Sequence, residues 1–280
     1  MIESGDIVSD VIRPIELSII LPTINEGENI RNLIPELFKT LGQHVNGLEV
    51  IVVDDGSTDS TRFVVAELSA RYQSVSAIFR SSSEKSLPGS IQTGIDAAVG
   101  EIVVWMDADG SMTSDVVVNL LKAWKLTPQN EATVVIASRF VAGGGLKGSD
   151  TTGSTPLHKV IRNLHLSEDS LLAVFLSWIL NRTLSLVLDR CCVDVTSGFI
   201  LAPKSVLSSH RLSGIYGDYF PRLMYKMHKN GIKIVEIPYT ILVRTNGKSK
   251  TGTTVIQILR SGMPYLKVFL VPFSTRLSRD

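Results

Sequence analysis

The sequence contains little cysteine, and its cysteines and histidines are not spaced as the ligands of a structural zinc ion. The two cysteines, Cys191 and Cys192, are neighbours in the chain, where the geometry of a disulfide is difficult to reach. There is no C-x-x-C motif, and the five histidines show none of the spacings of known metal motifs. We therefore expect a chain in a reducing, cytosolic environment, without structural zinc.

Long hydrophobic runs are also absent, since no stretch reaches the roughly 18–20 apolar residues that a membrane-spanning helix needs. The apolar run at residues 171–180 is too short, and residues 255–273 are interrupted by Arg260 and Lys267. Both segments are more typical of helices that lie on a surface than of helices that cross a bilayer. The chain begins with acidic and polar residues, so we expect no secretory signal.

Neither sign of charge is in excess, since the net charge is +1 at pH 7 and 20% of the residues are charged. Such a balance creates no field that would attract nucleic acid, and we expect no nucleic-acid partner. The length of 280 residues and the hydrophobic content of 44% are sufficient for one α/β domain of roughly 200–250 residues with an appendage.

What the sequence does contain is a regular alternation of short apolar runs and amphipathic segments. The runs are rich in β-branched residues and predict buried strands, while the segments between them carry apolar residues at helical spacing. Such alternation is typical of an α/β fold with a mostly parallel central sheet and helices on both faces. The predicted strands are residues 16–22, 48–53, 74–79, 101–106, 133–138 and 233–237, and the predicted helices lie near residues 25–41, 60–72, 89–99, 114–125, 168–189 and 218–229.

Polar residues gather where these predicted strands end. The first strand ends in PTINE, the second in DDGSTD, the fourth in DADGS and the fifth in SRF. Because the carboxyl ends of parallel strands meet at one edge of a sheet, ligands of such folds bind there. No glycine-rich phosphate-binding loop joins a predicted strand to a predicted helix, so a phosphorylated ligand must be held in another way.

Asp107 and Asp109 stand one residue apart at the end of the fourth predicted strand. Two unpaired carboxylates would repel each other and resist burial, whereas a divalent cation would remove both penalties. Hard oxygen ligands suit Mg²⁺ or Mn²⁺, which would bridge the carboxylates and a diphosphate. Gly110 favours a turn that aims one carboxylate at the metal and the other at a ribose or a bridging water. A solvated turn without a ligand is the alternative.

The motifs PTINEGENI, VVDDGSTDST, MDADGS, SRF, DVTSGF and RTNGKSKTG occur in the order seen in glycosyltransferase family 2. The chain resembles most closely the polyprenyl-phosphate branch of that family, the dolichol-phosphate mannosyltransferases and their bacterial relatives, over roughly residues 16–252. The resemblance implies a GT-A (Rossmann-like) fold, a nucleotide diphosphate sugar as donor, Mg²⁺ or Mn²⁺ as cofactor and a lipid phosphate as acceptor at a membrane surface. It leaves the sugar and the base open between GDP-mannose and UDP-glucose.

The resemblance assigns a donor site mainly to residues at the ends of the first, second and fourth predicted strands. Val53 and Asp55 would contact the base and the ribose, and Arg244 and Lys250 would close over the phosphates. The full set of implied donor-binding residues is Pro22, Ile24, Glu26, Val53, Asp55, Asp107, Ala108, Asp109, Arg244 and Lys250.

The resemblance also implies catalytic roles for Asp109, Arg139 and Asp194. Arg139 would bind a phosphate through two parallel hydrogen bonds, and Asp194 would be the carboxylate on the acceptor side. A phosphate acceptor is already largely ionised near pH 7, so Asp194 would then orient the acceptor or the sugar. For a hydroxyl acceptor, Asp194 would have to remove a proton.

The chain departs from the family pattern at two serines. Ser111 stands where the dolichol branch has glutamine, and it is assigned with Asp107 and Asp109 to the metal shell as a weaker, neutral ligand. Ser86 stands where the family usually has glycine after the lysine of the third loop, so a different path is expected for that loop.

We expect two parts in the chain, a glycosyltransferase domain at residues 1–252 and an amphipathic membrane-surface anchor at residues 253–280. In the second part, Arg260 and Lys267 stand among apolar residues, as in interfacial helices that face anionic headgroups. Pro264 is expected to break this segment into two short helices. A helix docked on the domain or on a partner protein is the alternative.

The function indicated by these features is an inverting, metal-dependent transfer of mannose or glucose from a nucleotide diphosphate sugar to a polyprenyl phosphate. We expect the protein to be cytoplasmic and peripheral, on the cytoplasmic face of the membrane. Two alternatives stay open at this point: a soluble family 2 glycosyltransferase that acts on a saccharide hydroxyl, and a non-catalytic protein that binds nucleotide sugars.

Overall fold

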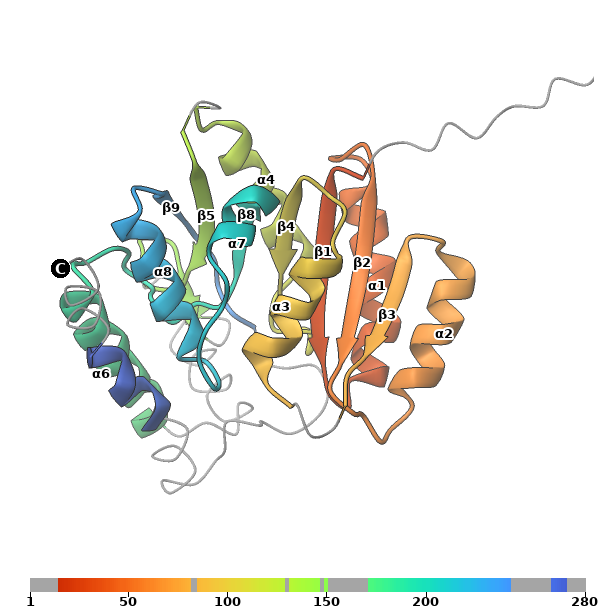
Figure 1. The fold of residues 1–280 in the computed structure, drawn as a ribbon, viewed down its shortest axis with the longest axis horizontal. Helices are drawn as coiled ribbons and strands as arrows, with labels where there is room; N and C mark the ends of the chain where they lie inside the picture. The colour runs from red at the N-terminus through yellow and green to blue at the C-terminus, as the bar shows by residue number, and fades with distance from the viewer. Residues whose placement is uncertain are drawn as a thin grey trace, which may run out of the picture.

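A seven-stranded, mostly parallel sheet runs through the computed structural model of the chain (Figure 1). The structure describes residues 15–81, 85–128, 131–146, 149–150, 171–242 and 263–270. The strands lie in the order β3-β2-β1-β4-β8-β5-β9, and a separate pair is formed by β6 and β7. Their bounds are β1 Leu17–Thr23, β2 Leu48–Asp54, β3 Val75–Phe79, β4 Ile102–Trp105, β5 Thr133–Ser138, β6 Gly145–Leu146, β7 Ser149–Asp150, β8 Ile200–Pro203 and β9 Lys233–Pro238.

The central strands form where β-branched and aliphatic residues can be buried on both faces of the sheet. β1 lies in the middle, with Ile19 paired to Val50 of β2 and to Val104 of β4, all in parallel register. Each predicted strand is present, with ends that shift by no more than one residue. The mostly parallel α/β sheet is therefore confirmed.

β8 runs antiparallel to both of its neighbours, β4 and β5. The sequence did not indicate this reversal, because β8 comes after the irregular segment at residues 188–199 and its four residues give no periodic pattern. The pairing of Ile136 with Ile200 brings the amino end of β8 to the edge where β5 ends. Residues before β8 and residues after β5 are therefore neighbours in space.

Helices cover both faces of the sheet, as predicted (Figure 1). One face buries residues of α1, α2 and α4 in a first core, and the other buries residues of α3, α6, α7 and α8 in a second core. The short helix α7, which comes directly after β8, was not predicted. The bounds are α1 Gly27–Leu41, α2 Thr61–Arg71, α3 Leu87–Ala97, α4 Ser114–Lys125, α6 Leu171–Val187, α7 Lys204–Ser209 and α8 Tyr219–Lys229.

Part of the segment that we expected to be an anchor packs on the domain. Residues 263–266 are helical and lead into the 3-10 turn η2 (Lys267–Leu270), where Val268 is fully buried in the second core. The boundary predicted at residue 252 lies outside the described residues, as does Arg260. In the part of the chain that the structure describes, no helix has both the length and the apolar character needed to cross a membrane.

The contact between α3 and β1 is testable at Gly94, where a Cβ atom would overlap the γ carbons of Ile20. Alanine in place of glycine inside a helix normally stabilises by about 1 kcal/mol. Because this site has no room, we expect Gly94→Ala to lower the free energy of unfolding by about 1–3 kcal/mol in urea denaturation. In an Ile20→Ala background the penalty should vanish, and an equal penalty in both backgrounds would contradict the packing described.

Candidate functional site

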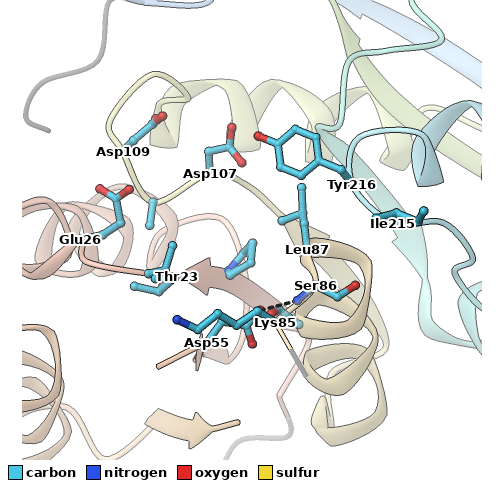
Figure 2. A pocket seen from close by; sticks show the side chains of 14 residues that line it. Thr23, Glu26, Asp55, Lys85, Ser86, Leu87, Asp107, Asp109, Ile215 and Tyr216 are labelled. Carbon is cyan, nitrogen blue, oxygen red and sulfur yellow. Dashed lines mark hydrogen bonds between the residues drawn. The ribbon is translucent and has the colours of Figure 1, made fainter. Parts of the chain in front are cut away.

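A cavity of about 290 Å³ opens at the edge of the sheet where β1, β2 and β4 end (Figure 2). Its lining includes seven of the predicted donor-site residues, which come from three separate loops. They are joined by side chains from the start of α3 and from the loop between α7 and α8. The lining residues are Pro22, Thr23, Ile24, Glu26, Asp55, Lys85, Ser86, Leu87, Ser90, Asp107, Ala108, Asp109, Ile215 and Tyr216.

The loops after β1 and β2 are bound to each other by hydrogen bonds. Asn25 adopts a left-handed backbone, with φ of 54°, and its amide N–H donates to the hydroxyl of Ser57 at 2.7 Å. The Asn25 side-chain oxygen in turn accepts the amide of Thr58 at 2.7 Å. Gly27 lies so close to α2 that a Cβ atom would stand 2.6 Å from the Ser60 hydroxyl. The floor of the cavity is therefore preorganised before any ligand binds.

The two adjacent carboxylates at the end of β2, Asp54 and Asp55, have different roles. Asp54 is fully buried and accepts both the amide and the hydroxyl of Ser57, which closes the turn. Asp55 lines the cavity and accepts Arg80 Nη1 at 2.7 Å and the amide of Ser86 at 3.0 Å. Only Asp55 therefore lies where a donor could be bound, and Asp54 is structural.

Arg80 and Asp55 fix the start of α3, and with it Lys85. The Nη1 atom of Arg80 also donates to the hydroxyl of Ser90 at 3.0 Å. Ser86 adopts an extended backbone, with φ of −167°, and its hydroxyl caps α3 by accepting the amide of Gly89. Serine at position 86 is thus used for capping, which a glycine could not do. Lys85 lies at the cavity beside Asp55 (Figure 2).

The turn expected after Asp109 is present. Gly110 has φ of +79°, a conformation that favours glycine, and it comes after a nearly buried Asp109. Asp109 accepts the amide of Ser111 at 2.9 Å, while Asp107 is exposed and faces Tyr216 across the cavity (Figure 2). Ser111 is not among the residues that line the cavity, and the metal contact expected of its side chain stays a prediction.

The residues fit a divalent cation that is shared with a bound diphosphate. In the described residues, no group of three or more His, Cys, Asp or Glu side chains is arranged to hold a metal ion. Mg²⁺, however, is commonly bound by only one or two carboxylates together with substrate phosphates and water. Asp107 and Asp109, which both line the cavity, supply such a pair.

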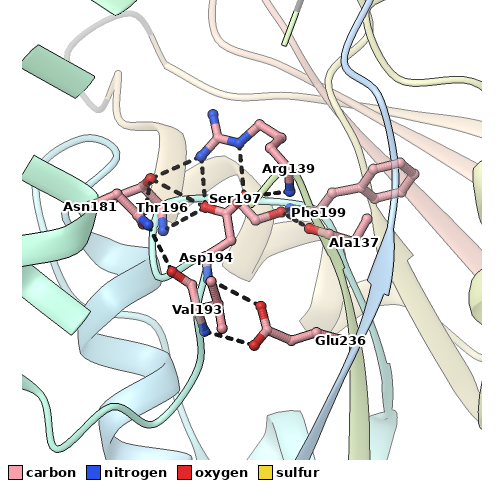
Figure 3. Close-up of polar contacts among 9 residues, drawn as sticks. All are labelled: Ala137, Arg139, Asn181, Val193, Asp194, Thr196, Ser197, Phe199 and Glu236. Atoms are coloured by element: carbon pink, nitrogen blue, oxygen red, sulfur yellow. Dashed lines mark hydrogen bonds and ion pairs between the residues drawn. The ribbon is translucent and has the colours of Figure 1, made fainter. Parts of the chain in front are cut away.

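Arg139 and Asp194 form a buried ion pair at the same edge of the sheet (Figure 3). Arg139 comes directly after β5 and Asp194 precedes β8, so the antiparallel pairing brings them together. The guanidinium donates from Nε and Nη2 to the two carboxylate oxygens at 2.8 and 2.7 Å. The carboxylate of Asp194 raises the pKa of Arg139 and outweighs the opposing effect of burial.

This pair changes the roles expected of both residues. Arg139 makes to Asp194 the two parallel hydrogen bonds that were predicted for a phosphate. Its Nη1 atom points away from these hydrogen-bonded residues (Figure 3). The side chain of Asp194 is completely buried, so it has no surface with which to contact an acceptor. It also accepts Thr196, whose hydroxyl binds Asn181 of α6 at 3.1 Å. Asp194 therefore orients Arg139.

The other predicted residues that the structure describes do not line the cavity. Val53 is fully buried in the second core, so it has no exposed side-chain surface with which to contact a base. Arg139 and Asp194 are not among the residues that line the cavity. Arg244 and Lys250 lie outside the described residues, and their roles stay predictions.

Lys85, Ile215 and Tyr216 are among the lining residues that the sequence did not single out. Lys85 belongs to the loop in which the sequence singled out only Ser86. Ile215 and Tyr216 belong to the segment SGIYGD between two helices. The two glycines of that segment were the available signal of a tight loop, and Gly214 indeed has φ of +145°.

The family model described as Glycosyl transferase family 2 matches residues 18–184 of the chain. The chain is 30% identical to a dolichol-phosphate mannosyltransferase of Pyrococcus furiosus, over 88% of this chain and 62% of that protein. It thus spans less than two thirds of that relative. It is 27% identical to a polyprenol monophosphomannose synthase of Mycolicibacterium smegmatis, over 88% of this chain and 85% of that protein. An undecaprenyl-phosphate mannosyltransferase of Micrococcus luteus is also 27% identical, over 87% of this chain and 93% of that protein.

Solved structures of a glucosyl-3-phosphoglycerate synthase from Mycobacterium tuberculosis have the same fold. Its complex with Mn²⁺, uridine diphosphate and phosphoglyceric acid matches with a TM-score of 0.59 at 18% identity, over 91% of this chain and 77% of that chain. Its complex with Mg²⁺ and uridine diphosphate matches with a TM-score of 0.56 at 18% identity, over 92% of this chain and 78% of that chain. At this identity the likeness concerns the fold alone, and it confirms the predicted GT-A architecture.

The ion pair is testable through stability. Asp194→Asn leaves the guanidinium of Arg139 without its counter-charge, and we expect a loss of about 3–5 kcal/mol in the free energy of unfolding at pH 7. Thr196→Val removes one neutral partner of the same guanidinium, so a loss of only about 1 kcal/mol is expected. Urea denaturation measures both. Wild-type stability of Asp194→Asn would show that the pair is not formed in solution.

Proposed function

The chain belongs to glycosyl transferase family 2, and from this premise we propose that it transfers a hexose from a nucleotide diphosphate sugar to a polyprenyl phosphate. The observation that carries the proposal is the cavity itself, which gathers Glu26, Asp55, Asp107 and Asp109 from three loops. The relatives support the acceptor, since their names specify dolichol, polyprenol and undecaprenyl phosphates. The same names favour mannose as the sugar.

The donor would lie along the cavity from Lys85 to Asp107. The nucleoside would occupy the part next to Pro22, Ile24 and Asp55, and the diphosphate would lie near the carboxylates after β4. A Mg²⁺ or Mn²⁺ ion bound there would stabilise negative charge on the leaving diphosphate. Structural neighbours crystallised with Mn²⁺ or Mg²⁺ support this use of a metal.

The state of Asp194 favours a phosphate acceptor over a hydroxyl acceptor. A hydroxyl must lose its proton to a base, whereas a phosphate monoester is already ionised near pH 7. The side chain of Asp194, the base considered for a hydroxyl, is completely buried and its oxygens are occupied by Arg139 and Thr196. Attack by an ionised phosphate oxygen at the anomeric carbon, with inversion, requires no such base.

The transfer is testable with purified protein, GDP-mannose or UDP-glucose, and either a polyprenyl phosphate or free sugars. We expect hexosyl transfer to the lipid phosphate only, and we expect EDTA to abolish it. Asp109→Ala should lower kcat/KM by about 10²–10³-fold, because charge on the leaving group loses its stabilisation. Asp96→Ala, which changes an exposed carboxylate on α3, is the matched control. Transfer to free sugars but not to lipid would favour the saccharide-directed alternative. Donor binding without any turnover would favour the non-catalytic one.

A membrane position is the second part of the proposal. Leu176, Trp178 and Ile179 of α6 are 37–48% exposed, and Met263 and Leu266 are 61% and 57% exposed. α6 contacts η2, so these side chains belong to adjoining elements. Arg182 and Lys267 are exposed on the same two elements, as expected of a surface that meets anionic headgroups. We place this surface on the cytoplasmic leaflet, where the two free thiols would stay reduced.

Flotation with anionic liposomes tests this surface. The pair Trp178→Glu and Leu266→Glu should each reduce the bound fraction several-fold, because a charge must leave the interface. Phe63→Glu is the matched control, since Phe63 is 69% exposed on α2, at the other end of the sheet from α6 (Figure 1). If all three variants float like the wild type, the surface is not the membrane contact.

A further inference from the structure

The loop between α7 and α8 forms the wall of the cavity that faces Asp107. Ile215 and Tyr216 line the cavity, and the hydroxyl end of Tyr216 points toward Asp107 (Figure 2). These two residues stand apart from the loops after β1, β2 and β4, and no sequence motif assigned them a role. In the proposed function, the transferred hexose would lie beside Tyr216 and the carboxylates of Asp107 and Asp109.

Asp218 holds this loop from the inside. Its Oδ1 atom accepts the amides of Ile215 and Tyr216, both at 2.9 Å, and its Oδ2 atom accepts Arg222 Nε at 3.0 Å. Asp218 is almost completely buried. A buried carboxylate is tolerated only when donors replace its water, so these contacts fix the backbone of the wall.

Tyr265 holds the loop from the outside. The Tyr265 hydroxyl lies in contact with Gly217, at the place that a Cβ atom of residue 217 would occupy. Gly217 is not among the residues with a left-handed backbone, so the absence of a side chain there is a matter of space. Gly214 is equally crowded, since its Cβ atom would stand 2.9 Å from the backbone nitrogen of Tyr219.

Tyr265 belongs to the segment at residues 263–270, which is itself anchored. Val268 is fully buried, and Tyr265 and Phe269 pack against the second core. Burial raises the pKa of Tyr265, the positive charge of Arg139 opposes the rise, and Tyr216, Asp218 and Asp194 add to it. Tyr265 is therefore within electrostatic range of both the buried ion pair and the cavity wall.

We propose that Tyr265 is a positioning residue. It presses on the loop at residues 214–218 from one side, while Asp218 binds the backbone of that loop from the other, so that Tyr216 faces the hexose beside Asp107. The segment at residues 263–270 then completes the active site in addition to any contact with a membrane. The inference rests on the proposed function only in naming the hexose as the group that Tyr216 faces. The clamp itself depends on the contacts of Gly217, Asp218 and Tyr265.

Three variants test the clamp from both sides. Tyr265→Ala removes the clamp, and Gly217→Ala pushes the ring away with one methyl group. Tyr265→Phe keeps the ring but removes the hydroxyl that contacts Gly217, so it should have a smaller effect than Tyr265→Ala. Leu126→Ala is the control, because Leu126 is 86% exposed at the end of α4 and does not line the cavity. Thermal unfolding establishes whether each variant is folded. If Tyr265→Ala is not folded, the single variants Tyr265→Phe and Gly217→Ala decide whether the clamp exists.

The first measurement is amide hydrogen exchange of the peptide that contains Ile215 and Tyr216, in the full chain without ligands. We expect exchange about 10-fold faster in Tyr265→Ala and Gly217→Ala, because local opening no longer has to break the clamp. Leu126→Ala should match the wild type. Unchanged exchange in both clamp variants would overturn the proposal, whatever reaction the protein catalyses.

The second measurement is transfer to a short-chain prenyl phosphate in detergent, which removes the need for membrane binding. We expect kcat/KM to fall about 10–100-fold in the two clamp variants, since a misplaced wall misplaces the hexose. The affinity for the nucleoside diphosphate alone should stay unchanged. A wild-type chain that transfers nothing would refute the proposed function but leave the exchange result to judge the clamp.

Discussion

A carboxylate can leave water only where donors replace the water that it loses, and this constraint shapes the site. Asp54, Asp194 and Asp218 are all buried, and each is surrounded by hydrogen-bond donors from its own loop or from an arginine. Because each carboxylate accepts at least one backbone amide, satisfying the carboxylate also fixes the chain around it. The exposed Asp107 is the contrast, a carboxylate left at the rim of the cavity.

The same constraint explains how charge is distributed between the two parts of the site. At the cavity, Arg80 neutralises Asp55, while the carboxylates after β4 contribute negative charge to the lining. On the other side, Arg139 is held by Asp194, and Glu236 of β9 accepts the amides of Val193 and Asp194 (Figure 3). The guanidinium is thus positioned by residues that are themselves held in place.

Much of the fold could be predicted from the sequence because it is encoded locally. Apolar runs of strand length and amphipathic segments between them specify β1 to β5 and the helices that cover them. The loops that line the cavity were predictable for the same reason, since PTINE, DDGSTD and DADGS each lie where a strand ends. Residues at the carboxyl ends of parallel strands must lie at the common edge of the sheet.

The rest depends on contacts between distant residues, which leave no local pattern. The reversal of β8 results from pairing with β4 and β5, and without it the meeting of Arg139 and Asp194 could not be foreseen. Val53 is a different case, because its place in the donor site came from the family resemblance, and the buried position of its side chain is visible only in the structure. Lys85 and Tyr216 reach the cavity through loops whose course is set by Asp55 and Asp218, so only the assembled structure places them.

The reversed strand has an evolutionary consequence. Two sets of segments therefore reach the same edge of the sheet, the loops up to residue 111 and segments after residue 138. The secondary-structure elements that carry the two sets are far apart in the gene. Selection on the later segments can reshape their side of the rim without disturbing the side built by the earlier loops. A scaffold divided in this way is well suited to diversify by keeping one reactant and exchanging the other.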